Sequence, residues 1–432
     1  MQVNGGIDFV GALVLVVFIG TYIAISSEKV NRTATSLLGM GLVGVIIWAA
    51  GEGNFSSVTE RIEWHIVLFV TAMMIIVTIA TSSGMFQYLS VELTRPTRAK
   101  TRHLFIGYLG FVFIISLVLD TTSTMLIMAP LTIELCKGLE LDFRPFLISE
   151  AIVCNFASTP SIVGAVPNLV IAEQTVLDQG LLFASLMPLS VILFLVSIPI
   201  LLRYFDVFLV QSDQLLIDEI MFVNPQYMIR SQRDFYGSIV AILVLIISFT
   251  VGHSVGFQPS MIAILVAAAL LLSSREFVDD ILKKVNWGTI FFLVGLFGLV
   301  AALEITGVID EIGVAVGALI GGDKTLAIVF MIWVPGLLSA VIDNIPISAV
   351  VAPIAVQFAG ISPLLPMALI LGVNIGGFIL PIGSPANILA LAFAEKEHKP
   401  INMIEFAKIA TPLGLLMLGI STGWLLLLSL FI

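Results

Sequence analysis

Two aspartates occur in apolar sequence at matching positions in the two halves of the chain. Asp120 begins the run DTTSTMLIMAP and Asp343 begins DNIPISAVVAP, and both runs end in Ala-Pro. A charged side chain at the centre of a bilayer costs at least about 2.5–3.5 kcal/mol on insertion scales, so a symmetric pair needs a function. We interpret the pair as a site that loads and releases protons or a cation. The alternative is that each aspartate caps a helix N-terminus, and both roles are compatible because that terminus attracts anions.

The residues that follow the two aspartates are polar. Thr121 and Thr122 come directly after Asp120, and Asn344 comes directly after Asp343. Hydroxyl and amide groups can replace the water around a small polar solute or ion, so we predict that these side chains contribute to the same site. The alternative is that the hydroxyls bond back to carbonyls of their own helix.

Four asparagines form a second repeated set. Asn155 and Asn168 of the first half recur with the same spacing as Asn374 and Asn387 in the second, in stretches that contain Gly and Pro. An amide offers donors and acceptors without a net charge. Irregular backbone within a membrane is tolerated only where protein or water covers it, so we predict unwound helix segments around one cavity lined by these amides. For Asn168 and Asn387 the alternative is a capping role after the Pro-containing breaks.

The composition indicates that these residues lie in a membrane protein. The chain has 432 residues, of which 59% are hydrophobic and 11% are charged, whereas about a quarter of a soluble domain is charged. Apolar runs of roughly 18 residues or more are long enough to cross a bilayer as helices. We therefore predict an all-α polytopic membrane protein, with the lipid bilayer as its surroundings. The net charge of −10 excludes nucleic-acid binding.

The two halves of the chain align as an internal repeat. Matches up to the aspartates keep one constant offset in residue number, since Asp343 minus Asp120 and Pro353 minus Pro130 are both 223. Matches at the asparagines keep a second offset of 219, so four residues are deleted between the two motifs. We predict a first repeat at 1–203, a connector at 204–235 and a second repeat at 236–432.

Loop charges predict how the repeats lie in the membrane. Basic short loops stay on the cytoplasmic side, which places 26–34 and 92–103 inside and the N-terminus outside. The uncharged loop 253–258 is then outside, although its counterpart 26–34 is inside. The repeats are therefore predicted to be inverted, as in many secondary transporters, and a parallel repeat is the alternative. We expect a multi-pass protein of the cell (inner or plasma) membrane with the connector 204–235 in the cytoplasm.

Other motifs restrict the class of function. The chain has no Walker loop and hence no ATPase of its own, so movement of a solute must use a proton gradient or a sodium gradient. Glu304 lies near the end of an apolar run, with Thr81 at the equivalent position. It is a candidate for proton coupling, and the alternative is an interfacial residue. The histidines and cysteines lack metal-ligand spacing, so we expect neither a metal site nor a cofactor.

An intramembrane aspartyl protease also pairs two membrane aspartates, and it is the remote alternative from another class. Such proteases need Gly-x-Gly-Asp at the second aspartate, and here Asp343 follows Ala340-Val341-Ile342. We therefore expect that the protein is not an enzyme.

At these motifs the chain resembles the ion transporter superfamily, in particular the branch of arsenite/antimonite permeases, NhaD-type sodium/proton antiporters and the melanosomal P protein. The likeness covers nearly the whole chain. It is carried by LDTTSTMLIMAP (119–130), VGLFGLVAALEITGVID (294–310), AVIDNIPISAVVAPIA (340–355) and GVNIGGFILPIGSPANILA (372–390). The resemblance implies re-entrant helical hairpins, an elevator-type transport domain and a homodimer. A soluble ATPase partner is not predictable from the chain.

Departures from the family pattern bear on the transported substrate. Dicarboxylate-transporting relatives typically have Ser-Asn-Thr where this chain has Asp120 and Asp343, and the like charges disfavour an anionic carboxylate substrate. Relatives often carry Asp-Pro-Pro-Asn where this chain has AVPN (165–168), which weakens a sodium site. LPIGSPAN (380–387) is more similar to the arsenite permeases, although these usually have Asn at the position of Asp343.

We therefore predict a secondary active transporter that works as a proton-coupled antiporter and exports a small inorganic substrate, arsenite or antimonite. The alternative with the same fold is a sodium/proton antiporter that uses the same two carboxylates.

Overall fold

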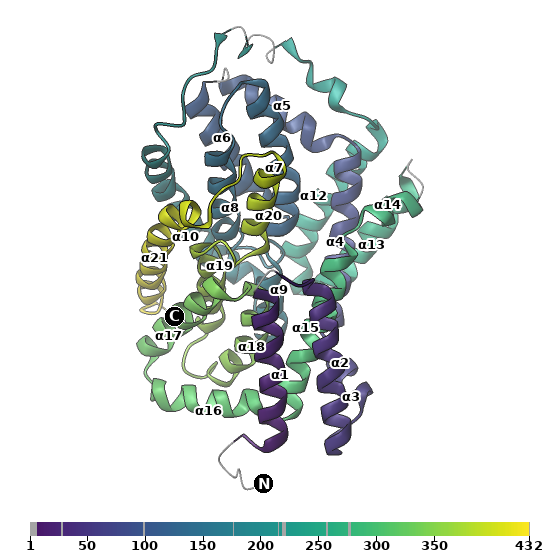
Figure 1. Cartoon of the computed structure of the whole chain (residues 1–432), viewed down its shortest axis with the longest axis vertical. Coiled ribbons are helices and arrows are strands. Elements are labelled where there is room, and N and C mark those ends of the chain that lie inside the picture. The colour runs from purple at the N-terminus through teal and green to yellow at the C-terminus, as the bar shows by residue number, and fades with distance from the viewer. Residues whose placement is uncertain are drawn as a thin grey trace.

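The computed structural model describes residues 7–26, 29–97, 100–175, 177–214, 216–217, 222–255, 258–274 and 278–431, apart from the side chains of 249–255. The regular elements in these ranges are 20 α-helices and one 3-10 turn (Figure 1). Loop 253–258, which was used to predict the orientation, lies partly outside the described residues.

The helices follow one another in the same order in both halves. The first half contains α1 (Phe9–Ser26), α2 (Arg32–Ala50), α3 (Phe55–Glu60), α4 (Trp64–Ser82), α5 (Met85–Thr97), α6 (Thr101–Ile115), α7 (Thr121–Gly138), α8 (Arg144–Ala157), α9 (Val166–Thr175) and α10 (Gln179–Tyr204). The turn η1 (Pro225–Met228) precedes the second half, which contains α12 (Gln232–Val255), α13 (Pro259–Ser273), α14 (Val278–Lys284), α15 (Trp287–Ile305), α16 (Val308–Ile320), α17 (Lys324–Val341), α18 (Asn344–Gln357), α19 (Leu365–Ile379), α20 (Pro385–Lys396) and α21 (Met403–Leu428).

The helix bounds keep the offsets of the sequence repeat. The first and last residues of α15 come 223 positions after those of α4, and the same is true of α16 and α5. The first residue of α20 comes 219 positions after that of α9. Figure 1 shows α5 and α6 at the top of the molecule and their counterparts α16 and α17 at the bottom. The two halves therefore run in opposite directions along the long axis. The repeat boundaries proposed from the sequence stay a prediction.

Long apolar helices make the chain a polytopic membrane protein, as predicted. Seven helices among the described residues are long and apolar enough to cross a membrane, namely α1, α2, α4, α10, α15, α17 and α21. Large apolar side chains on their outer faces are exposed, including Val16, Trp48 and Leu195. Such surfaces suit contact with lipid tails, because each helix satisfies its own backbone hydrogen bonds.

Two irregular segments interrupt the helices in the middle of the protein. They join α8 to α9 over 158–165 and α19 to α20 over 380–384, and most of their residues are buried. A Cβ on Gly164 would lie 2.5 Å from the carbonyl oxygen of Ser116, and one on Gly383 would lie 2.4 Å from that of Ser339. Glycine is required at both positions because each break is pressed against the helix that precedes an aspartate motif.

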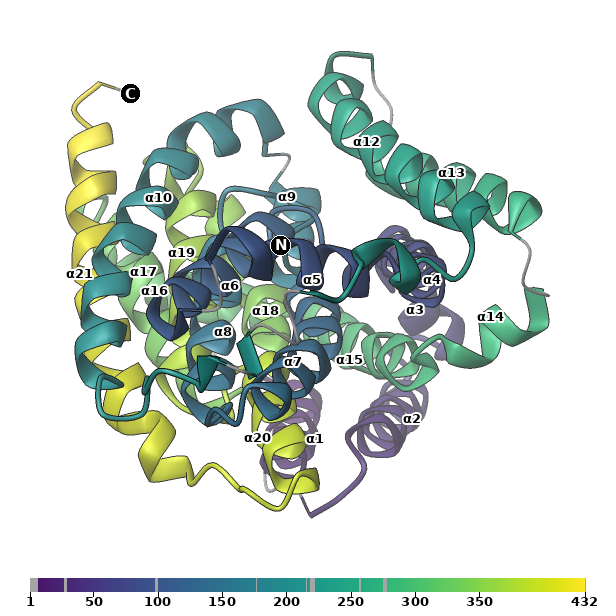
Figure 2. The same ribbon diagram turned by 90° about the horizontal axis from the view of Figure 1, so that it is seen from above.

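The helices next to these breaks pack across the two halves. The helix that follows Asp120, α7, packs against α20, and the helix that follows Asp343, α18, packs against α9. Seen from above in Figure 2, α21 lies at one edge of the molecule, and α12 with α13 lies on the other side, where α12 also contacts α10. The pairs α7–α20 and α9–α18 bring the two repeated motifs together between these two sides.

The segment before α12 is fixed on the turn between α4 and α5. The backbone N–H of Arg230 donates to the carbonyl oxygen of Ser83 at 2.9 Å. The neighbouring Gly84 has a φ of 86°, and a Cβ there would lie 1.9 Å from the carbonyl oxygen of Met228. A side chain at position 84 would therefore force the connector away from this turn.

We predict that Gly84→Ala destabilises the protein by about 1–3 kcal/mol or more, because left-handed backbone strain adds to the clash with Met228. The measurement is the thermal unfolding midpoint of purified protein in detergent, together with protease cleavage near η1. Gly51→Ala is the matched control, since Gly51 has a φ of 75° but open space around its Cβ position. An equal loss of stability in the two variants would show that contact between the connector and the turn before α5 does not stabilise the protein.

Candidate functional site

Four asparagine side chains meet where the irregular segments of the two halves face each other. Asn155 lies in α8, Asn374 in α19, and Asn168 and Asn387 in the first turns of α9 and α20. All four are fully buried. Asn155 Nδ2 donates to Asn387 Oδ1 at 3.3 Å, and Asn374 Nδ2 donates to Asn168 Oδ1 at 2.6 Å. The structure thus brings the four predicted asparagines together, and the contacts exchange between the halves as a two-fold axis requires.

Two of these amides close the breaks in the helices. Asn168 Nδ2 donates to the backbone carbonyls ten and seven residues before it, at 2.9 and 2.8 Å. Asn387 Nδ2 makes the same two bonds in the second half, at 2.9 and 3.0 Å. These carbonyls lie where each helix unwinds and its regular hydrogen bonds end, and those of Ser158, Ser161 and Leu380 also accept a backbone N–H three residues later at 3.1–3.3 Å. The two amides therefore have a structural role at the breaks.

The other two amides have an oxygen to spare. Asn155 Nδ2 and Asn374 Nδ2 each donate a second bond, at 2.8 Å, to the carbonyl four residues earlier in their own helix. Their Oδ1 atoms are buried without a hydrogen-bond partner among the described residues, and so is Asn344 Nδ2. An unpaired buried polar group costs about 1–3 kcal/mol. Such groups call for an explanation, and a polar ligand is one.

Two of these three unpaired atoms lie around a glycine in α19. A Cβ on Gly377 would lie 3.3 Å from Asn344 Nδ2, 3.5 Å from Asn155 Oδ1 and 3.3 Å from the carbonyl oxygen of Gly383. An unpaired donor from α18 and an unpaired acceptor from α8 therefore converge on a backbone position without a side chain. We call Asn155, Asn344 and Gly377 the amide cradle.

The two aspartates cap the helices that begin at the repeated motifs. The Asp120 carboxylate accepts from the backbone N–H of Thr122 at 3.0 Å and of Ser123 at 3.1 Å. The Asp343 carboxylate accepts from the backbone N–H of Ile345 at 3.0 Å. Both carboxylates therefore face the positive end of a helix dipole, which stabilises their charge.

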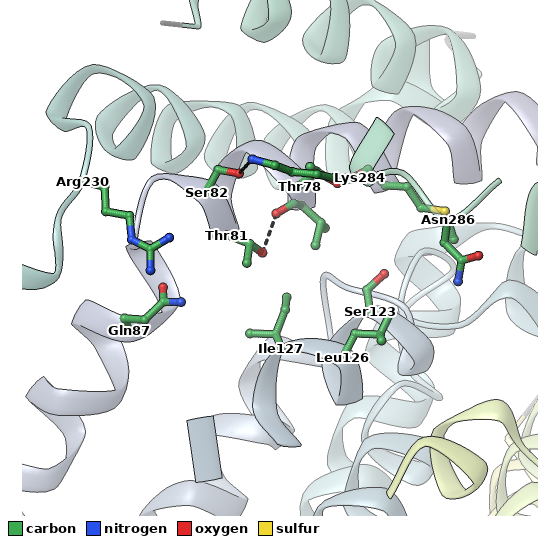
Figure 3. A pocket seen from close by; sticks show the side chains of 12 residues that line it. Thr78, Thr81, Ser82, Gln87, Ser123, Leu126, Ile127, Arg230, Lys284 and Asn286 are labelled. Carbon is green, nitrogen blue, oxygen red and sulfur yellow. Dashed lines mark hydrogen bonds between the residues drawn. The ribbon is translucent and has the colours of Figure 1, made fainter. Parts of the chain in front are cut away.

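Two cavities flank the start of α7. The first, of about 220 Å³, is lined by Asp343, Thr122, Tyr22 and Arg32 among others, and we call it the Asp343 cavity. The second, of about 350 Å³, is shown in Figure 3. Its polar lining comes from several segments and consists of Thr78, Thr81, Ser82, Gln87, Ser123, Arg230, Lys284 and Asn286. Asn286 lines both cavities, so the two lie on either side of one residue.

The two aspartates do not have equivalent surroundings. Asp120 borders a space of only about 10 Å³, whose other lining residues are apolar and include Phe69, Met73 and Val166. Asp343 borders the much larger cavity, where Pro385 occupies the position equivalent to Val166. The space beside the carboxylate is therefore smaller in the first half than in the second, although Thr122 and Ser123 of the first motif line the two larger cavities.

The remaining predicted residues lie at the start of α7 and at the end of α15. Thr121 is buried at the first position of α7. Glu304 Oε2 lies 3.7 Å from Arg61 Nη1, and about a third of the Glu304 side chain is exposed. The structure thus places Glu304 in a partly exposed ion pair and not in either cavity described above.

Several residues of the site were missed by the sequence analysis. Arg32, Asn286 and Gly377 have no counterpart of the same type in the other repeat, so the search for symmetric pairs did not select them. A signal did exist for Arg32, because it is a cation at the border of an apolar run. Glu150 is an acid without a counterpart in the other repeat, where Leu369 is equivalent, and it is fully buried. It accepts a hydrogen bond from Thr132 Oγ1 at 2.6 Å.

Comparison with known proteins gives the family. The family model described as "Citrate transporter" (CitMHS) matches residues 22–360. The chain belongs to this family. An uncharacterized transporter of Mycobacterium bovis is 30% identical over 399 residues, which cover 91% of this chain and 92% of that protein. The 46 kDa membrane protein of Mycobacterium leprae is 29% identical, with 92% of this chain and 94% of that protein covered. The mouse P protein is 27% identical over 96% of this chain and 60% of its own length.

Solved structures share the fold at low sequence identity. The MtrF structure of Neisseria gonorrhoeae superposes with a TM-score of 0.56 at 13% identity, covering 96% of this chain and 94% of that one. The YdaH transporter of Alcanivorax borkumensis has a TM-score of 0.53 at 13% identity, with 87% and 86% covered. The predicted resemblance to the ion transporter superfamily and to the P protein is confirmed, and the citrate transporter family member described here is a secondary transporter.

We predict that Asn168→Ala and Asn387→Ala destabilise the protein to a similar extent, because each removes two hydrogen bonds to carbonyls of a break, at roughly 0.5–1.5 kcal/mol for each bond. The measurement is thermal unfolding in detergent. Asn402→Ala is the control, since Asn402 caps α21 through one exposed bond at 2.9 Å. An unchanged unfolding temperature of Asn168→Ala or Asn387→Ala would show that the amide does not stabilise the break in that half.

Proposed function

We propose that this transporter is a proton-coupled antiporter that exports arsenite or antimonite, the neutral trihydroxides. The observation that supports this is the amide cradle, where a buried acceptor on Asn155 and a buried donor on Asn344 converge on Gly377, and Asn374 has a further buried acceptor. Each hydroxyl of a neutral trihydroxide both donates and accepts a hydrogen bond, so it would satisfy both kinds of atom. The amides carry no charge and match a substrate without one.

The charges of the site argue against free citrate, the substrate in the family's description. Both repeated motifs place a carboxylate at a helix N-terminus, Asp120 and Asp343. A tricarboxylate would meet these like charges, and Arg32 is the one cation among the described residues that line the Asp343 cavity. Electrostatic repulsion between carboxylates at close range is strong in a partly buried site.

Sodium is the second candidate, and a separate feature favours it. The unpaired atoms of Asn155 and Asn374 are carbonyl oxygens, which are ligand atoms that hard cations prefer. Exchange of sodium against protons would use the same architecture with a cationic substrate.

Protonation of the aspartates would couple the proton gradient to movement. Asp120 and Asp343 hold the starts of α7 and α18 through charge-assisted hydrogen bonds. A proton on either carboxyl group weakens that cap and removes the charge from the helix terminus. We infer alternating access in which the helices at the two motifs move against the outer helices. We place the protein in the cell membrane as a homodimer, with the N-terminus outside and the connector in the cytoplasm.

The decisive experiment compares three substrates in proteoliposomes under an imposed pH gradient. We expect uptake of arsenite driven by the proton gradient, with no uptake of citrate. Sodium movement in its place would select the second candidate. Citrate uptake driven by the same gradient would overturn the proposal.

We predict that Asp120→Asn abolishes the pH dependence of transport and leaves the folded protein intact, because the amide keeps the oxygen that caps α7 but cannot exchange a proton. Transport at several pH values and thermal unfolding of the same preparation provide the measurement. An unchanged pH profile in this variant would show that Asp120 carries no proton.

We also predict that Gly377→Ala lowers transport by tenfold or more, since the methyl group would occupy the space between Asn155 and Asn344 and about 1.4 kcal/mol corresponds to a factor of ten. Gly419→Ala is the control, because a Cβ on Gly419 meets nothing within 4 Å. Normal transport by Gly377→Ala would show that the substrate does not enter the amide cradle.

A further inference from the structure

A cation from the first half of the chain faces the second aspartate motif. Arg32 is the first residue of α2, and it lines the Asp343 cavity together with Asp343. Its guanidinium group donates to Thr289 Oγ1 at 3.3 Å and lies 5.4 Å from the centre of the Phe292 ring. Both anchoring residues belong to α15, so the position of the charge is set by the contact between α2 and α15.

The contact between α2 and α15 is tight. A Cβ on Gly295 would lie 2.6 Å from the Oγ of Ser36, and one on Gly298 would lie 2.5 Å from the Cγ of Met40. Thr33 Oγ1 also donates to the carbonyl oxygen of Gly288 at 2.8 Å. Helices in such close contact move together, so α2 and α15 form a common frame that carries Arg32.

Asp343 belongs to a different group of helices. It caps α18, which packs against α9 and α19 in the core. Of the described side chains that line the cavity beside it, Arg32 carries a charge and the Tyr22 phenol is titratable, while Thr122 and Asn286 are neutral. A phenol ionises only in alkaline solution. Arg32 is therefore the partner that can compensate an ionised Asp343 across this cavity.

The first half does not repeat this arrangement. Asp120 borders a nearly closed space with apolar lining, and the position equivalent to Arg32 in the second half of the sequence is Val255. The cation is therefore specific to one of the two motifs, although the motifs themselves are equivalent. A role in the shared architecture of both halves does not account for it.

We propose that Arg32 is an electrostatic latch for Asp343, holding the transporter in the conformation in which the Asp343 cavity is open until a proton or the substrate neutralises Asp343. Arg32 is a positioning residue in this scheme. The attraction between the two charges operates only while α18 lies beside the frame of α2 and α15. Movement of α18 with an ionised Asp343 would separate the charges at low dielectric, which is costly. This proposal rests on the proposed proton-coupled alternating access.

The test follows the opening of the cavity and does not require transport. Ser26 lines the same cavity, so Ser26→Cys is a reporter, in a background with the buried Cys136 and Cys154 replaced by alanine. The rate of maleimide labelling is measured on the full chain in nanodiscs at pH 5 to 8.5, with correction for the reactivity of a free thiol. We expect corrected labelling to be at least about fivefold faster at high pH, the lower range of typical coupling effects.

The variants separate a latch from local packing. Arg32→Gln should reduce corrected labelling at high pH to the level seen at low pH, and Arg32→Lys, which keeps the charge, should restore part of the difference. Asp343→Asn should give slow labelling at every pH. Adding Arg32→Gln to Asp343→Asn should then change nothing further, because the latch has already lost its partner.

Two control variants test whether the loss of a hydrogen bond to Arg32, or the loss of a cation elsewhere, changes the labelling rate. Thr289→Val removes the bond to Arg32 without changing any charge and should keep most of the pH dependence. Arg102→Gln removes an exposed cation that pairs with Asp206 and should leave labelling unchanged.

The outcomes are distinct. Arg32→Gln could slow labelling by the same factor in the protein with Asp343 and in the Asp343→Asn variant. In that case Arg32 acts through packing, and the latch is refuted. Unchanged pH dependence in Arg32→Gln refutes it as well. If labelling behaves as expected but neither arsenite nor sodium moves in proteoliposomes, the latch stands and the proposed substrates fail. If transport is coupled to protons but the labelling rate is the same with and without Arg32, the proposed function stands and the latch is refuted.

Discussion

Backbone groups that lie within a membrane must find hydrogen-bond partners inside the protein, and this requirement governs the centre of the molecule. Two helices unwind there, and in each half the freed carbonyls are taken by the amide of an asparagine, Asn168 or Asn387. The glycines of the same segments, Gly164 and Gly383, allow the breaks to lie against a neighbouring helix. Three of these carbonyls, on Ser158, Ser161 and Leu380, also accept a backbone N–H of the same break, so the amides add a second bond that holds each break in place.

The two-fold relation between the halves follows from the same amides. Asn155 of the first half contacts Asn387 of the second, and Asn374 of the second contacts Asn168 of the first. An interface of this kind is self-complementary, so a single ancestral unit could pair with its own copy. Because every amide N–H in this set is used in fixing the backbone or the partner, the oxygens of Asn155 and Asn374 are left for another role. The same four side chains thus stabilise the fold through their N–H groups and offer oxygens for the proposed binding of a substrate.

Much of this arrangement could be predicted from the sequence, because polar and charged residues that recur at equivalent positions of an apolar repeat stand out. Their burial in a membrane costs free energy, so their recurrence indicates a role. The two constant offsets between the halves selected Asp120 with Asp343 and the four asparagines, and the helix order follows the same offsets. What could not be predicted comes from contacts without symmetry. Arg32 reaches the Asp343 cavity because α2 packs on α15, and sequence spacing carries no information on that contact. Glu304 was selected as an unpaired acid, but its partner Arg61 lies in the other half of the chain.

The difference between the two aspartate motifs bears on how a transporter built from equivalent halves would work. Asp120 borders about 10 Å³ and Asp343 about 220 Å³ of space, and three other lining positions of the first space, Val163, Val166 and Leu169, have equivalents in the second. The Asp343 cavity is also lined from α1 and α2, whereas the lining of the space beside Asp120 comes from α4, α9 and the break before α9. The inequality thus reflects which helices lie beside each motif. An arrangement in which the first motif is open and the second closed would use the same local contacts with the halves exchanged, and so would differ little in free energy. Two such states of similar energy are what alternating access requires, and a single asymmetric charge such as Arg32 is enough to bias the choice between them.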